Sequence, residues 1–94
     1  MKEVHKMKTV EVKLSNTWNG KLAMEPVKVE VEKGLYLQLS YETNDNTWNL
    51  SCFDYREKYL NIYDIKGYCK RLSTINKAIK NSVINWNVEF VLIK

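Results

Sequence analysis

The sequence predicts an α+β fold: an antiparallel meander of about five strands, one amphipathic helix packed on its apolar face, and a C-terminal strand. Apolar and polar residues alternate from residue 9 to residue 63, the period of half-buried strands. After Asp64 the apolar residues recur every three or four positions, the period of a helix. The 94 residues suffice for one hydrophobic core, so we expect a single domain over residues 1–94, with residues 1–7 as a loosely held arm.

The first hairpin is predicted from Asn19-Gly20, a strong signal for a two-residue turn with positive φ at both positions. Closing the chain there sets Val12 opposite Val27 on one face. The same register pairs Glu11 with Lys28 on the other face. The first two strands are therefore expected to pair along their length.

Three more turns follow from keeping the apolar residues of each strand on one face. A three-residue loop at 32–34, with glycine last, aligns Val29 with Leu37. The inward residues then change from odd-numbered to even-numbered sequence positions. The next loop must therefore hold an even number of residues, which Asn44-Asp45 satisfies. An odd loop at 55–57 joins Cys52 to Leu60 and completes the meander.

The helix is predicted with Asp64 as a plausible N-cap, or with a later start near Ser73 because Gly67 weakens the first turn. Its apolar stripe includes Ile65, Leu72, Ile75, Ile79 and Val83. The last strand alternates with Trp86, Val88, Phe90 and Leu92 inward. Outward Val91 and Ile93 indicate cover on both faces, as in a central strand. The pattern does not place this strand in the sheet, and a position beside the first strand is only a guess.

The sequence carries no catalytic, metal or cofactor signature, so we expect a protein that is not an enzyme. His5 lies in the N-terminal arm, and Cys52 and Cys69 are interpreted as reduced, buried small hydrophobes. Acidic residues near lysine on the strands are better explained by cross-strand charge pairing than by a cation site. With no membrane span and no signal peptide in the sequence, a cytoplasmic location is expected.

The first candidate binding surface is the second face of the third to fifth strands, where aromatic residues stand among uncharged polar ones. Such a surface is typical of an interface core. Cover by the chain itself or by a second copy in a homodimer is the alternative. The residues we expect to bind there are Tyr36, Gln38, Phe53, Tyr59, Asn61 and Tyr63.

The second candidate is a basic helix, because residues 65–94 hold six Lys or Arg against one acidic residue. Cations on one helix face attract phosphates or an acidic protein, and a solvated polar face is the alternative. The residues concerned are Lys66, Lys70, Arg71, Lys77 and Lys80.

Every tryptophan precedes an asparagine, which resembles a repeated motif, but the spacings of 30 and 38 residues match no structural repeat. Trp48 and Trp86 are in phase with inward residues and are predicted to be core anchors. Trp18 precedes the first turn, so it alone is predicted to be a contact residue, at a hairpin tip.

The composition indicates the kind of genome that encodes the chain. Lysine outnumbers arginine 13 to 2 and asparagine occurs 10 times, a bias that matches AT-rich codons. Small size, this bias and a missing active site are shared by many phage-encoded inhibitors of bacterial defence, anti-CRISPR proteins among them. We therefore predict a non-catalytic protein from a phage or mobile element that binds or inhibits a macromolecule, most simply a protein, for example a host defence factor such as a CRISPR effector.

The alternative function is nucleic-acid binding. In that hypothesis Tyr36, Phe53, Tyr59 and Tyr63 stack on bases while the helix lysines hold the backbone.

Overall fold

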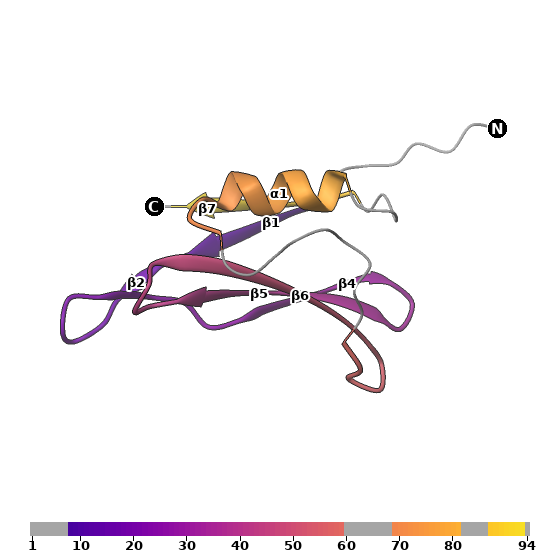
Figure 1. Ribbon diagram of the computed structural model, residues 1–94, viewed down its shortest axis with the longest axis horizontal. Helices are drawn as coiled ribbons and strands as arrows, with labels where there is room; N and C mark the ends of the chain where they lie inside the picture. The colour runs from indigo at the N-terminus through magenta and orange to yellow at the C-terminus, as the bar shows by residue number, and fades with distance from the viewer. Residues whose placement is uncertain (1–7, 60–68, 82–86, 94) are drawn as a thin grey trace.

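The computed structural model describes residues 8–59, 69–81 and 87–93 of the chain (Figure 1). Within these residues it forms seven strands and one helix. The elements are β1 (Lys8–Lys13), β2 (Ser15–Asn16), β3 (Leu22–Ala23), β4 (Val27–Glu32), β5 (Leu35–Glu42), β6 (Thr47–Asp54), α1 (Leu72–Lys80) and β7 (Val88–Ile93).

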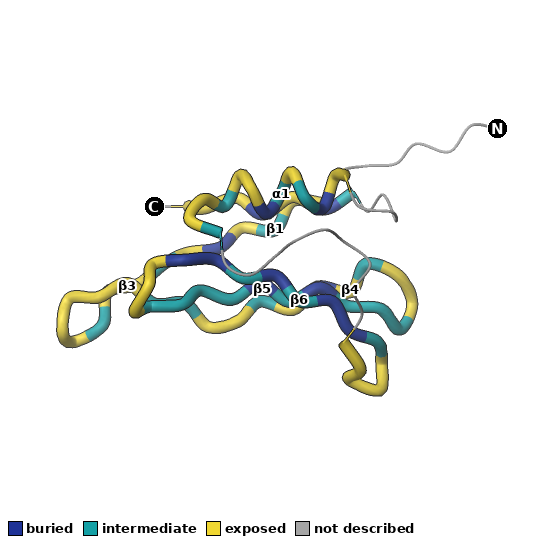
Figure 2. The backbone as a smooth tube through the Cα atoms, in the orientation of Figure 1, coloured by how far each residue is buried: buried dark blue, intermediate teal, exposed yellow. Residues whose placement is uncertain are grey.

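The elements form two layers that face each other across one core (Figure 1). One layer is the antiparallel sheet β4-β5-β6, and the other holds the parallel pair β1-β7 together with α1. The predicted α+β class is confirmed, as are the meander and the helix followed by a final strand. Most buried positions lie where the layers meet (Figure 2), and the core consists of Val12, Val29, Leu37, Leu39, Trp48, Leu50, Cys52, Ile75, Ile79, Val88 and Phe90.

The register of β4 against β5 is the one that the apolar pattern predicts. Val29 pairs with Leu37, and both side chains are buried. At the end of β4 a bulge shifts the pairing so that Glu32 faces Leu35, which leaves a turn of two residues instead of three. Gly34 has a φ of 78°, a backbone conformation that glycine adopts without steric cost.

The register of β5 against β6 also agrees with the sequence argument. Leu39 pairs with Leu50 and Glu42 with Thr47, so the intervening loop holds an even number of residues, 43–46. Trp48 is buried as predicted. The bridge between Phe53 and Tyr59 fits the odd loop at 55–57. The rest of the expected fifth strand lies outside the described residues, as does Trp86.

The first hairpin differs from the prediction at its tip. Ser15 pairs with Ala23, so the loop is the three-residue segment Trp18-Asn19-Gly20. Gly20 has a φ of 80°, whereas Asn19 does not have the positive φ that a two-residue type I′ turn requires. The whole register is therefore shifted by one residue.

The first two strands do not pair along their length, so this part of the prediction is wrong. The shift in register explains why the first strand leaves the meander. Continuing the observed register would set Glu11 opposite Val27 and Val10 opposite Lys28, which mixes polar and apolar residues on each face. Pro26 also has no N–H to donate to a ladder. After the short β2-β3 ladder the chain divides, and β1 enters the other layer while β4 begins the sheet.

The last strand lies beside the first, a position that the sequence pattern left open. β7 pairs with β1 in parallel, with Val10 opposite Phe90 and the Lys8 N–H donating to the Asn87 carbonyl at 2.7 Å. The prediction of a central strand is wrong for the described residues, because β1 is the only strand paired with β7 there. Val91 and Ile93 are accordingly 37% and 38% exposed.

The second edge of β7 is closed by a side chain of the helix. Asn76 Nδ2 donates to the Phe90 carbonyl at 2.8 Å, and the Phe90 N–H donates to Asn76 Oδ1 at 2.8 Å. The side-chain amide of Asn76 thus forms the two backbone hydrogen bonds with Phe90 that a neighbouring strand would otherwise form. These bonds fix α1 against β7 while Ile75 and Ile79 enter the core.

The helix begins at Leu72 with Arg71 at the N-cap position. This agrees with the later of the two predicted starts, near Ser73. The alternative N-cap, Asp64, lies outside the described residues. No described helix has the length and apolarity that crossing a bilayer requires.

We predict that Asn76→Ala destabilises the protein by about 2–4 kcal/mol, because two partly buried backbone groups of Phe90 lose their partner. Alanine has a higher helix propensity than asparagine, so a loss of stability in this variant cannot come from helix propensity. The free energy of unfolding in urea measures the effect. Lys77→Ala, on the exposed face of the same helix, is the control and should change stability by less than about 0.5 kcal/mol. Equal effects of the two changes would contradict the role of Asn76.

Candidate functional site

An aromatic cluster, formed by Tyr36, Phe53 and Tyr59, lies on the face of the β4-β5-β6 sheet that points away from the core. Tyr36 and Phe53 are cross-strand partners whose ring centroids lie 5.8 Å apart at 25°. Tyr59 meets Phe53 edge to face at 6.0 Å. Phe53 is only 7% exposed, so it forms the floor of the cluster, with the two tyrosines beside it.

Charged side chains border the aromatic cluster. The Lys28 ammonium lies 4.7 Å from the centroid of the Tyr36 ring and 4.8 Å from that of Phe53, within cation–π range. The negative charge of Glu30 raises the pKa of the Tyr36 hydroxyl, with smaller contributions from desolvation and a hydrogen bond to Glu30. The Tyr36 phenol therefore stays protonated, and the cluster has a rim of mixed charge.

The cluster continues into a loop that we call the tyrosine hairpin, residues 54–59. Its backbone closes with hydrogen bonds from the Asp54 N–H to the Lys58 carbonyl at 3.0 Å and from the Glu57 N–H to the Asp54 carbonyl at 2.9 Å. The Asp54 carboxylate also accepts the N–H groups of Arg56 and Lys58, at 2.8 and 3.0 Å. Glu57 has a φ of 63°, a conformation that these bonds hold in place.

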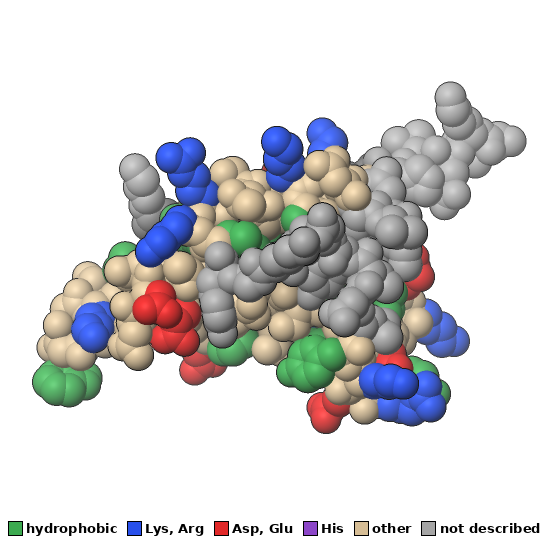
Figure 3. Space-filling model, viewed as in Figure 1, with side chains coloured by type: hydrophobic (Ala, Val, Ile, Leu, Met, Phe, Trp, Pro, Cys, Tyr) green, Lys and Arg blue, Asp and Glu red, His purple; other side chains and the backbone are tan. Residues whose placement is uncertain are grey.

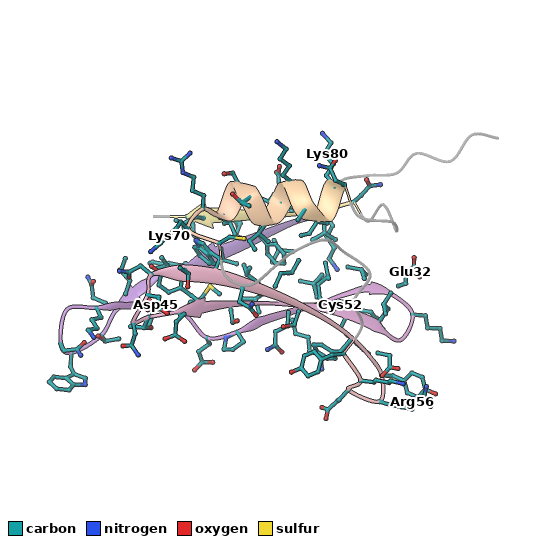
Figure 4. All side chains as sticks on the ribbon, in the orientation of Figure 1. Glu32, Asp45, Cys52, Arg56, Lys70 and Lys80 are labelled. Carbon is teal, nitrogen blue, oxygen red and sulfur yellow. The ribbon has the colours of Figure 1, made fainter. Side chains whose placement is uncertain are left out.

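The tyrosine hairpin exposes large side chains although its backbone is held. Tyr55 and Tyr59 are 70% and 72% exposed. The Arg56 guanidinium lies 5.4 Å from the Tyr55 ring centroid, and Figure 4 shows Arg56 at the far end of the sheet from the first hairpin. Tyr55 also leans over the preceding turn, where a Cβ added to Gly34 would lie 3.4 Å from its ring.

The structure brings together three of the six residues predicted for the aromatic face: Tyr36, Phe53 and Tyr59. Gln38 lies on the same face, half-buried, while Asn61 and Tyr63 lie outside the described residues. Sequence reasoning treated Tyr55 and Arg56 only as turn residues. The sequence feature that could have pointed to them is Tyr55 itself, because a tight turn does not require a large aromatic residue.

The basic helix lies on the opposite side of the molecule from the aromatic cluster. Its cationic side chains project from the outer surface of α1, as the blue side chains along the helix show in Figure 3. Arg71, Lys77 and Lys80 are exposed, as is Lys70, whose ammonium donates to the Asp45 carbonyl at 3.2 Å. Lys66 lies outside the described residues.

Trp18 stands alone at the tip of the first hairpin with 97% of its surface exposed. The tip is closed by hydrogen bonds from the Thr17 N–H to the Lys21 carbonyl at 2.7 Å and from the Gly20 N–H to the Thr17 carbonyl at 3.0 Å. The Lys21 ammonium donates to Asn44 Oδ1 at 3.4 Å, which ties the hairpin to the loop after β5. The structure thus places Trp18 as the sequence predicts.

The described residues contain no group of three His, Cys, Asp or Glu side chains placed to hold a metal ion. Both cysteines are free: Cys52 is buried, and Cys69 is half-buried, less than predicted. Burial raises the pKa of the Cys52 thiol to about 11, which leaves it protonated and unreactive.

Comparison of the chain with protein families, with characterised proteins and with solved structures found no match. The surfaces described above are therefore the basis for any functional assignment.

The Asp54 carboxylate makes the stability of the tyrosine hairpin depend on pH. The Lys58 backbone N–H, followed by that of Arg56 and the two positive charges, lowers its pKa below the ordinary 3.8. A carboxyl whose pKa is lower in the folded state stabilises the fold above its unfolded pKa, and this stability is lost as pH falls through the folded pKa.

We predict that Asp54→Asn lowers the free energy of unfolding at neutral pH. Between about pH 6 and about pH 3, the free energy of unfolding of the variant should fall less than that of the wild type. Identical acid profiles for the two proteins would show that Asp54 has no such role.

Proposed function

We propose that the protein is a non-catalytic binding domain that contacts a protein partner through the aromatic cluster and the tyrosine hairpin. The observation that supports this most directly is that Tyr55 and Tyr59 are largely exposed. Tyr55 lies beside Arg56, and Tyr59 lies beside the buried ring of Phe53. Tyrosine and arginine are enriched among the few residues that contribute most of the energy of protein interfaces.

The hydrogen bonds of Asp54 support the same proposal. A loop that is already ordered loses little conformational freedom when it binds, so more of its contact energy appears as affinity. Asp54 holds the backbone of the tyrosine hairpin through its carboxylate and its own peptide groups. The exposed tyrosines therefore stand on a fixed backbone, which suits a binding site.

The finer proposal concerns the partner. The AT-rich composition and small size of the chain favour a phage or mobile-element protein that inhibits a host defence factor, for example a CRISPR effector. The β2-β3 hairpin, which carries Trp18 at its tip, lies at the far end of the molecule from Arg56 of the tyrosine hairpin, so Trp18 would be a second contact on a partner large enough to span both.

The arrangement argues against a single nucleic-acid site built from both predicted surfaces. Tyr36 and Phe53 point away from the core on one layer, and the lysines of α1 project from the other (Figures 3 and 4). One strand could not stack on these rings while the lysines hold the same stretch of its backbone. The aromatic surface is therefore assigned to protein contact.

Photo-crosslinking tests the proposal. A benzophenone amino acid in place of Tyr59 should give a discrete covalent adduct in lysate of a low-GC bacterium, whereas the same group in place of exposed Glu25 should not. Excess wild-type protein should compete for the adduct. The Tyr55→Ala/Tyr59→Ala variant should compete about 30-fold less well, which corresponds to roughly 2 kcal/mol at a hot spot.

Equal competition by the double variant and the wild type would contradict the proposal. An adduct with twice the mass of the protein would also contradict it, because the aromatic surface would then be a homodimer contact. Both tyrosines are largely exposed, so the variant should keep its fold, which circular dichroism verifies.

A further inference from the structure

We infer that the outer face of α1 is a separate contact surface for the phosphate backbone of a nucleic acid. We call this surface the basic stripe. It consists of exposed hydrogen-bond donors along one side of the helix and its ends: Arg71, Ser73, Thr74, Lys77, Lys80 and Asn81.

Among the residues that the structure describes, the cations of the basic stripe form no salt bridge with an acidic side chain. Residues 69–81 carry four Lys or Arg and no Asp or Glu, and the first turn of α1 lacks the acidic residue that commonly stabilises a helix start. The only salt bridge in the described part of the chain joins Arg56 to Asp54, far from α1. The charges of Arg71, Lys77 and Lys80 are therefore available to an anionic partner.

The kind of donor favours phosphate over an acidic protein surface. Lysine, serine, threonine and asparagine side chains are groups that commonly bind phosphate oxygens. No exposed aromatic or large apolar side chain lies on this face of α1, so it lacks the anchors typical of protein interfaces. Two of the three cations, Lys77 and Lys80, are lysines, which provide point charge without the planar fork by which arginine reads guanine, so the contact is expected to be largely independent of sequence.

The length of the basic stripe matches a short run of phosphates. With a rise of about 1.5 Å per residue, Arg71 and Lys80 lie roughly 14 Å apart along the helix axis. Measured along the axis of a duplex, this distance spans about four base-pair steps at roughly 3.4 Å each. Three cations over this length would neutralise about three phosphates.

The basic stripe does not depend on the proposed protein contact. It lies on the layer opposite the aromatic cluster, so both surfaces can be occupied at once. A domain of this shape would hold a protein partner on one side and nucleic acid on the other.

Fluorescence anisotropy with a labelled duplex of arbitrary sequence tests the inference. Three neutralised phosphates predict that log Kobs falls with log salt with a slope of about −2.7, so raising salt from about 50 to about 200 mM should weaken binding about 40-fold. Lys77→Gln/Lys80→Gln should reduce the slope to about −0.9 and the loss to about 4-fold. Glutamine keeps the helix propensity, so the fold should be unaffected.

The matched control is Lys33→Gln/Lys58→Gln, which removes the same charge from exposed positions away from α1. It should keep the wild-type slope, and Tyr55→Ala/Tyr59→Ala should also bind the duplex normally. Absence of binding at about 50 mM salt would overturn the inference, as would equal weakening in both lysine variants, which would indicate net charge alone. Polyglutamate that binds as tightly as the duplex would also overturn it, because the surface would then fit an acidic protein.

Discussion

The pair of hydrogen bonds between the Asn76 side chain and the Phe90 peptide is the contact on which the second layer depends. A pair of strands by itself is only marginally stable in water, and an open strand edge leaves peptide groups without partners. In this protein β1 bonds one edge of β7, and a helix side chain bonds the other at Phe90. Because Asn76 lies between Ile75 and Ile79 in α1, the bonds that close the strand also orient the apolar face of the helix toward the sheet.

Much of the fold follows from the sequence because strand register has a period of two. Whether the inward residues stand at odd or even sequence positions predicts both registers of β4-β5-β6, even though a bulge near Glu32 shortens the turn between β4 and β5 to two residues. The first hairpin could not be predicted in the same way, since Asn19-Gly20 favours a two-residue turn while the chain forms a three-residue one with Gly20 alone at positive φ. That single-residue difference moves β1 into the other layer.

No sequence pattern identifies the role of Asn76. It is a polar residue beside the apolar stripe of the helix, and its hydrogen-bond partner is the backbone of a strand that is distant in the sequence. For the candidate site, alternation placed Tyr36 and Phe53 on one face, but the exposure of Tyr55 depends on how the hairpin packs over Gly34.

The two layers give the molecule two chemically different outer surfaces. The sheet presents rings, with Lys28 over two of them and the tyrosine hairpin at one end. The helix presents Arg71, Lys77 and Lys80, and residues 69–81 hold no acidic residue. The same core separates these surfaces, so a partner on one need not displace a partner on the other. This separation is what leads us to assign protein contact to the aromatic side and phosphate contact to the helix.

Amide hydrogen exchange measured by NMR tests the central role of Asn76 most directly. Phe90 N–H has no strand partner on its side of β7 in the described structure, and its protection must come from Asn76 Oδ1. The account predicts that the Phe90 amide exchanges as slowly as that of Leu39, which lies in the central strand of the β4-β5-β6 sheet. Exchange of Phe90 at the rate of an open strand edge, while Leu39 remains protected, would contradict it.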